Sequence, residues 1–285
     1  MGQDRAVRLA ISNIGWAAAP LDSSVLAVLR GHGVAGIDVA PTRLWPRWEG
    51  ATESSARAWA RRHADAGFVI PAAQSLLYQT SGLALFGDAT GLIDHLRRVA
   101  DLVAALGAGV LVFGSPRIRD PGDRSADAAF AAARDVFGRV GAICAERDLC
   151  LCIEPNPAAY GCRFVQTSAE ARALIDAVGS PGFGLHLDAA GCHLAGEDPA
   201  AAVRASAGGI AHMHASEPQL GDFDAPVVDH AAVGAALREV GYDRWLSVEM
   251  RPQPVPAIDA ALTHVRAAYV GGPGPGVGGL GASDA

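Results

Sequence analysis

Eight short apolar runs, each followed by a stretch with the spacing of an amphipathic helix, constrain the fold of this chain more than any other feature. The runs that we expect to form strands are residues 7–12, 36–40, 69–75, 109–113, 149–154, 184–188, 210–214 and 246–249. The helices expected between them include residues 54–66, 91–106, 126–146, 169–178 and 231–240. Gly107, Gly179 and Gly241 follow three of these helices, and glycine commonly ends a helix.

This alternation predicts a parallel sheet, which is built either as an open doubly wound sheet or as a closed barrel. An open sheet would be expected to carry a glycine-rich phosphate turn after its first strand. The corresponding turn here reads Asn13-Ile14-Gly15-Trp16, which lacks that pattern. Eight strand–helix units are the number found in the (β/α)8 TIM barrel, so an α/β fold of this type is predicted.

The chain of 285 residues is long enough for one such barrel. Residues 1–270 are therefore expected to form a single (β/α)8 domain. The remaining segment, 271–285, is rich in glycine and proline, and we expect it to be a flexible tail.

Several classes of function are excluded by the absence of lysine, because all 23 basic residues are arginine. A Schiff-base aldolase, a pyridoxal-phosphate enzyme and a Walker A phosphate loop all need a lysine. The net charge of −7 argues against a nucleic-acid partner.

The chain is expected to work in the cytoplasm, away from membranes. No apolar run approaches the ~20 residues that span a bilayer, and the N-terminus shows no signal-peptide pattern. The five cysteines are odd in number and lack metal-site or redox spacing, so we interpret them as reduced thiols.

Polar residues end four consecutive predicted strands, where a buried core would not favour them. They are Glu154, Asp188, His214 and Glu249. In a barrel the chemistry lies at the carboxyl ends of the strands, so these side chains should converge. Three converging carboxylates repel one another unless a cation neutralises them. We therefore predict one divalent metal, for which oxygen ligands and one imidazole suit Mn²⁺ or Mg²⁺ best, with Co²⁺ or Zn²⁺ acceptable.

The segments around these ligands resemble those of the xylose isomerase-like TIM barrels, a superfamily of sugar isomerases and epimerases. The similarity spans roughly residues 7–270 and is carried by IEPNP, HLDAAGCHLAGED, HMHASEP and GYDRWLSVEM. The resemblance implies a metal bound by the same four residues. In the ketose 3-epimerase branch two glutamates exchange a proton with the carbon next to the carbonyl, through a cis-enediolate. Here these catalytic residues would be Glu154 and Glu249.

One position departs from the family pattern. Many members have a histidine three residues after the aspartate of strand six, where it contacts substrate oxygen, but this chain has Gly191 there. His193 follows two residues later. Either the loop is re-registered so that His193 makes that contact, which we favour, or the contact is lost. The polar residues Asn156 and Gln74, near other strand ends, are candidates for binding substrate hydroxyls.

Several arginines follow predicted strands and suggest an anionic group on the substrate. Those expected at the substrate are Arg43, Arg117 and Arg251, and Arg119 is a further candidate. His186 and His212 each precede a proposed ligand by two residues. We expect them one layer deeper in the barrel, as core histidines or as residues that orient a ligand.

The leading hypothesis is an isomerase or epimerase of a sugar or sugar derivative. A lyase that removes water from a keto-sugar or cyclitol is the alternative, because both reactions begin by proton abstraction next to a carbonyl. A three-metal phosphodiesterase would need extra histidines on the early strands, which are absent, and a non-catalytic barrel would not need four ligands. The expected partner is a small sugar-like molecule, and a homo-oligomer is left open.

Overall fold

The computed structural model describes residues 7–271 and contains eight parallel strands arranged as a barrel. The strands are β1 (Arg8–Ser12), β2 (Gly36–Asp38), β3 (Ala72–Ala73), β4 (Val110–Phe113), β5 (Cys150–Ile153), β6 (Phe183–Asp188), β7 (Ile210–Ser216) and β8 (Trp245–Glu249). Their order in the sheet is β2-β1-β8-β7-β6-β5-β4-β3. The predicted fold is confirmed.

The two end strands of this order, β2 and β3, meet and nearly close the barrel. Ile37 N donates to Val69 O at 2.9 Å, and Val39 N donates to Ala72 O at 3.0 Å. Strand β3 is shorter than predicted because Pro71 has no N–H to donate and Ser75 adopts a left-handed φ of 55°. The chain therefore leaves regular strand geometry on both sides of Ala72–Ala73.

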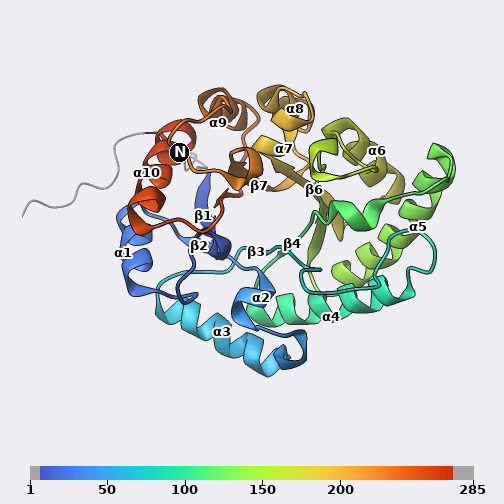
Figure 1. Ribbon diagram of the computed structural model, residues 1–285, viewed down its shortest axis with the longest axis horizontal. Coiled ribbons are helices and arrows are strands. Elements are labelled where there is room, and N and C mark those ends of the chain that lie inside the picture. The colour runs from blue at the N-terminus through green and yellow to red at the C-terminus, as the bar shows by residue number, and fades with distance from the viewer. Residues whose placement is uncertain (1–6, 272–285) are drawn as a thin grey trace, which may run out of the picture.

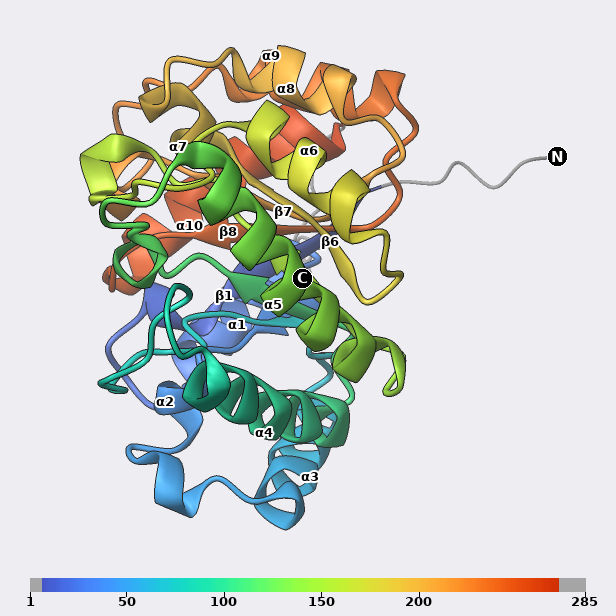
Figure 2. The ribbon, with the colours of Figure 1, turned by 90° about the vertical axis from the view of Figure 1, so that its right-hand side faces the viewer.

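Ten α-helices of the described residues surround the barrel (Figure 1). They are α1 (Ser23–Gly31), α2 (Pro41–Leu44), α3 (Glu53–Asp65), α4 (Thr90–Leu106), α5 (Ala126–Ala145), α6 (Ser168–Val178), α7 (Ala189–Leu194), α8 (Pro199–Ala205), α9 (His230–Glu239) and α10 (Val255–Val265). The longest, α4 and α5, lie side by side on the outside of the barrel (Figure 2).

Local sequence accounts for many helix boundaries. The side chains of Asp22, Thr52 and Ser125 each accept a hydrogen bond from a backbone N–H in the first turn of α1, α3 and α5. Gly107 and Gly179 end α4 and α6 in the left-handed conformation, as predicted. None of the helices within residues 7–271 is long and apolar enough to cross a membrane.

All five cysteines are free. The predicted tail lies, apart from Gly271, outside the described residues, so the boundary at residue 270 stays a prediction.

Candidate active site and metal centre

The four predicted metal ligands come from four neighbouring strands at one end of the barrel. Glu154 directly follows β5, and Asp188 and Glu249 end β6 and β8. His214 lies in β7 and pairs in register with Asp188 across β6 and β7. Parallel strands present their carboxyl ends on one side of the barrel, which is why residues 95 positions apart in sequence, from 154 to 249, share one site.

Ligand atoms of Asp188, His214 and Glu249 all lie within 4.8 Å of one another. Glu154 lines a cavity of about 110 Å³ together with His214 and Glu249. Its carboxylate lies against the Cα of Gly114, in the position that a β-carbon would otherwise occupy. The glycine after β4 is therefore required by the approach of Glu154.

Asp188 is oriented by the start of helix α7. Its Oδ1 accepts a hydrogen bond from Gly191 N at 2.5 Å, and its Oδ2 accepts one from Ser216 Oγ at 2.5 Å. Ser216 Oγ in turn accepts from Ala190 N at 3.2 Å. A β-carbon at Gly191 would lie only 3.2 Å from Asp188 Oδ1. The residue that departs from the family pattern is thus packed directly against the carboxylate.

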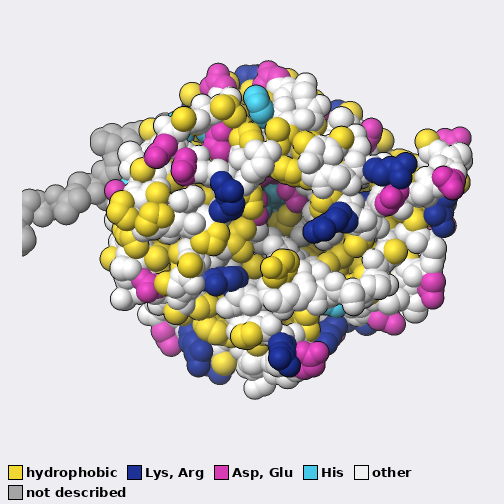
Figure 3. Space-filling view, viewed as in Figure 1, with side chains coloured by type: hydrophobic (Ala, Val, Ile, Leu, Met, Phe, Trp, Pro, Cys, Tyr) yellow, Lys and Arg dark blue, Asp and Glu magenta, His cyan; other side chains and the backbone are white. Residues whose placement is uncertain are grey.

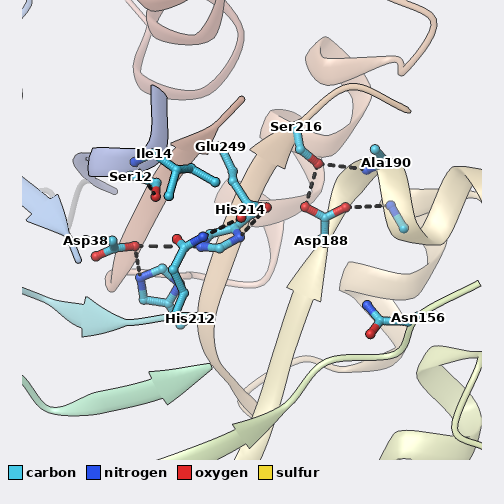
Figure 4. Close-up of polar contacts among 12 residues, drawn as sticks. Ser12, Ile14, Asp38, Asn156, Asp188, Ala190, His212, His214, Ser216 and Glu249 are labelled. Carbon is cyan, nitrogen blue, oxygen red and sulfur yellow. Dashed lines mark hydrogen bonds and ion pairs between the residues drawn. The ribbon is translucent and has the colours of Figure 1, made fainter. Parts of the chain in front are cut away.

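Asp38, at the end of β2, contacts His214 from the side opposite Glu249. Its Oδ2 lies 3.0 Å from His212 Nε2 and 3.7 Å from His214 Nε2, and all three side chains are buried. His214 Nδ1 lies 3.1 Å from Glu249 Oε2. Figure 4 shows His214 between the carboxylates of Asp38 and Asp188. A carboxylate beside one ring nitrogen favours the tautomer that leaves the other nitrogen free to bind a metal.

Asp38 was missed in the sequence because its strand is short and the other ligands already form a complete set. The available signal was an acidic residue in the apolar run Gly36-Ile-Asp-Val-Ala40. The prediction that His186 and His212 lie deeper in the barrel is confirmed, since both are fully buried and their rings stack with centroids 5.3 Å apart.

The electrostatics of the site favour a bound cation. Burial, reinforced by Asp188 and Glu249, raises the pKa of Glu154 to about 8. Burial and the charge of Glu249 raise the pKa of Asp188 to about 6. Burial also acts to raise the pKa of Glu249, but His214 and Gln74 hold it below its ordinary value. A divalent ion would relieve the repulsion among these three carboxylates, and the donor set of oxygens and one imidazole fits such an ion.

A sequence model described as the xylose isomerase-like TIM barrel matches residues 26–268. The chain belongs to this family. An L-ribulose 3-epimerase of Mesorhizobium japonicum is 35% identical over 85 residues, which are 30% of this chain and 29% of that relative. The matched segment is thus under a third of the relative's length.

Solved structures share the family's barrel. An L-ribulose 3-epimerase superimposes with a TM-score of 0.72 at 21% identity, over 92% of each chain. A D-psicose 3-epimerase, determined in the presence of D-fructose, has a TM-score of 0.73 at 14% identity, over 93% of this chain and 100% of its own. At these identities the likeness establishes the fold.

The polar residues predicted to bind substrate lie in different environments of this family barrel. Gln74 donates from Nε2 to Glu249 Oε1 in the cavity. Asn156 is buried, and its Oδ1 accepts a hydrogen bond from Arg119 Nη2 at 2.6 Å. His193 is exposed in the last turn of α7 and lines neither the cavity nor the neighbouring groove, so its predicted contact with substrate stays a prediction.

The candidate arginines divide into two groups. Arg119 is fully buried beside Asn156, and Arg43 donates to backbone oxygens of Trp16 and Ala18. Arg117 and Arg251 are exposed. Figure 3 shows arginine side chains around a hollow in which acidic side chains are visible. Only the exposed arginines are available to a ligand without breaking contacts that hold the barrel mouth.

Proposed function

We propose that this chain is a divalent-metal-dependent isomerase or epimerase that moves a proton on the carbon next to the carbonyl of a sugar. The observation that carries the proposal is that Glu154 and Glu249 line one small cavity from strands three places apart in the barrel. Carboxylates that reach a cavity from two sides can act on both faces of one carbon.

The two glutamates differ in proton affinity before a metal is bound. His214 and Gln74 hold the pKa of Glu249 below its ordinary value, so Glu249 is ionised and can accept a proton at neutral pH. Burial and the charges of Asp188 and Glu249 raise the pKa of Glu154 to about 8. A bound cation would relieve that repulsion, so we assign Glu154 the second proton-transfer role from its place in the cavity and not from its pKa.

Glu154, Asp188, His214 and Glu249 would hold the metal ion, for which Mn²⁺ or Mg²⁺ is the best match. When bound, the ion would supply positive charge that polarises the carbonyl and stabilises negative charge on its oxygen. Asn156 and Gln74, beside this ligand set, are proposed to bind substrate hydroxyls. Gln74 already contacts Glu249 and therefore positions that carboxylate as well.

The names of the similar proteins support the reaction class. The relative that matches part of the chain is an L-ribulose 3-epimerase, and two of the structural neighbours are an L-ribulose and a D-psicose 3-epimerase. Both names describe inversion at the carbon next to the ketose carbonyl. A small-molecule substrate and a cytoplasmic location fit this activity.

The test is proton exchange in deuterated water. The protein loaded with Mn²⁺ is incubated with D-fructose, L-ribulose and related ketoses, and deuterium at the carbon next to the carbonyl is followed by NMR. We expect exchange and a new epimer. Glu154→Gln and Glu249→Gln should each lower the rate by ~10²–10⁴ because the base is lost while a metal-binding oxygen remains. Glu146→Gln, on the exposed end of α5, is the matched control.

Metal analysis of each variant separates loss of the base from loss of the ion. If both Gln variants retain Mn²⁺ and turn over at the wild-type rate, the proton-transfer assignment is wrong. An unsaturated product without an epimer would instead identify the lyase.

A further inference from the structure

A groove of about 890 Å³ lies over the loops that follow β3, β4 and β5. Ser75 and Ser115 line both this groove and the active-site cavity, so the two spaces are neighbours. The cavity that contains Glu154 and Glu249 measures about 110 Å³, well below the ~300–1,000 Å³ of pockets that enclose a whole small ligand. The cavity therefore suits the reacting end of a substrate, and the groove suits the rest.

The groove has the mixed surface that binds rings with apolar faces and polar edges. Tyr78 and Tyr160 line it, and the Tyr78 side chain is 63% exposed although it is large and aromatic. The polar residues Gln79, Thr80 and Ser81 line the groove as well. Aromatic faces bury a flat ring, while the amide and hydroxyl groups bind its edge.

Three of the seven non-glycine residues that have a positive φ among residues 7–271 line this groove. Ser75, Gln79 and Ser115 line it with φ values of 55°, 61° and 47°, a region that side-chain-bearing residues rarely adopt. Such conformations persist only where the surrounding structure enforces them, and they cluster at ligand-binding sites.

Hydrogen bonds from outside the groove hold its walls in place. Trp48 Nε1 donates to Tyr78 O at 2.9 Å, and Leu85 N donates to Ile118 O at 3.0 Å, which ties the loop after β3 to the loop after β4. On the third wall, Gln219 N donates to the hydroxyl of Tyr160 at 3.0 Å. A groove held this way is preorganised, so little ordering energy is lost when a ligand enters.

We propose that the substrate is a keto-sugar carrying a ring-sized substituent, a second sugar or an aromatic group, which occupies this groove while the keto-sugar reaches the glutamates. The proposal rests on the proposed function for the reacting end. Unlike the proposed function alone, the groove proposal predicts that an unsubstituted monosaccharide leaves most of the binding surface unused.

The test compares D-fructose with isomaltulose, which is fructose bearing a glucosyl group on O6, and with 6-O-benzyl-D-fructose. Deuterium exchange gives kcat/KM for each, and calorimetry gives its affinity. We expect at least tenfold higher kcat/KM for a substituted ketose, and the two probes tell whether the ring is a sugar or aromatic. Tyr78→Ala and Ser81→Trp, which remove and fill the surface, should abolish that ratio. Val69→Ala, 54% exposed at the opposite end of the barrel, should preserve it.

Each outcome bears on one proposal. If free fructose exchanges as fast as both substituted ketoses do, the groove proposal is overturned and the proposed function stands. Absence of all exchange, with binding of a substituted ketose that Tyr78→Ala abolishes, supports the groove and refutes proton transfer. Fructose 6-phosphate is included as a third probe. If it reacts faster than both substituted ketoses, and if Arg117→Ala removes this advantage while Tyr78→Ala does not, the groove proposal is overturned.

Discussion

Replacement of Asp38 by asparagine tests how the proposed metal ligand His214 is oriented. Asp38 is fully buried, with Oδ2 3.0 Å from His212 Nε2 and 3.7 Å from His214 Nε2. Its negative charge favours a proton on His214 Nε2, which leaves Nδ1 to face Glu249 and the metal. Asparagine keeps the size of the side chain and removes the charge, so the preference for this tautomer weakens.

The structure sets the expected magnitude. Loss of a group that orients a metal-ligating histidine typically costs about 10–100-fold in metal affinity. At 3.7 Å the Asp38–His214 contact is too long for a full hydrogen bond, which argues for the lower end of that range. No water screens it, because both side chains are buried, so the effect should not vanish. We expect Mn²⁺ to bind about tenfold more weakly, or roughly 1.4 kcal/mol.

The assay is calorimetric titration of metal-free protein with Mn²⁺. Asp65→Asn, an exposed aspartate on α3, is the matched control and should bind as the wild type does. Thermal unfolding of the metal-free variants shows whether each one is folded. A folded Asp38→Asn protein with wild-type Mn²⁺ affinity would refute the orienting role of Asp38.

Two further predictions follow from the same site. Gly114→Ala would place a methyl group against the carboxylate of Glu154. Because a displaced catalytic group can cost about 10² in rate, kcat should fall. Gly109→Ala, with open space around it at the other end of β4, is the control and should keep the wild-type kcat. In the metal-free protein, the raised pKa values of Glu154 and Asp188, about 8 and about 6, mean that the folded state binds more protons than the unfolded state. Their stabilising contribution is fully present below the ordinary carboxyl pKa of about 4 and is lost by about pH 6 for Asp188 and about pH 8 for Glu154, so the unfolding temperature should fall from about pH 4 to 8 and Mn²⁺ should restore it. An unfolding temperature that rises from pH 6 to 8 without metal would contradict this reasoning.

The barrel could be predicted because its signals are local and repeated. Apolar runs of strand length and helix-ending residues such as Gly107 and Gly179 recur along the chain, and eight repeats leave few parallel folds to choose from. Strand β3 was overestimated because hydrophobicity does not reveal the missing N–H of Pro71 or the left-handed turn at Ser75. Boundaries of that kind depend on hydrogen bonding to neighbouring strands.

The approach of Asp188, His214 and Glu249 could also be predicted, since a barrel brings all strand ends to one side. Glu154 shares the cavity with His214 and Glu249, and its role as a fourth ligand stays a prediction. Asp38 was not, because its role depends on reaching across the barrel interior from β2 to His212 and His214. The arginines were likewise indistinguishable in sequence. Packing alone places Arg119 in the interior beside Asn156 and leaves Arg117 exposed on the groove.

The order of strands and helices along the chain, and the residue types that end each strand, can be read from the sequence because they depend on periodicity and on neighbouring residues. The geometry of the site cannot be read in this way. Three features arise where segments far apart in sequence meet: the distances among Asp188, His214 and Glu249, the contacts with His214 and Gln74 that lower the pKa of Glu249, and the groove beside Ser75 and Ser115. Their physical origin is contact and desolvation, which exist only once the barrel has formed.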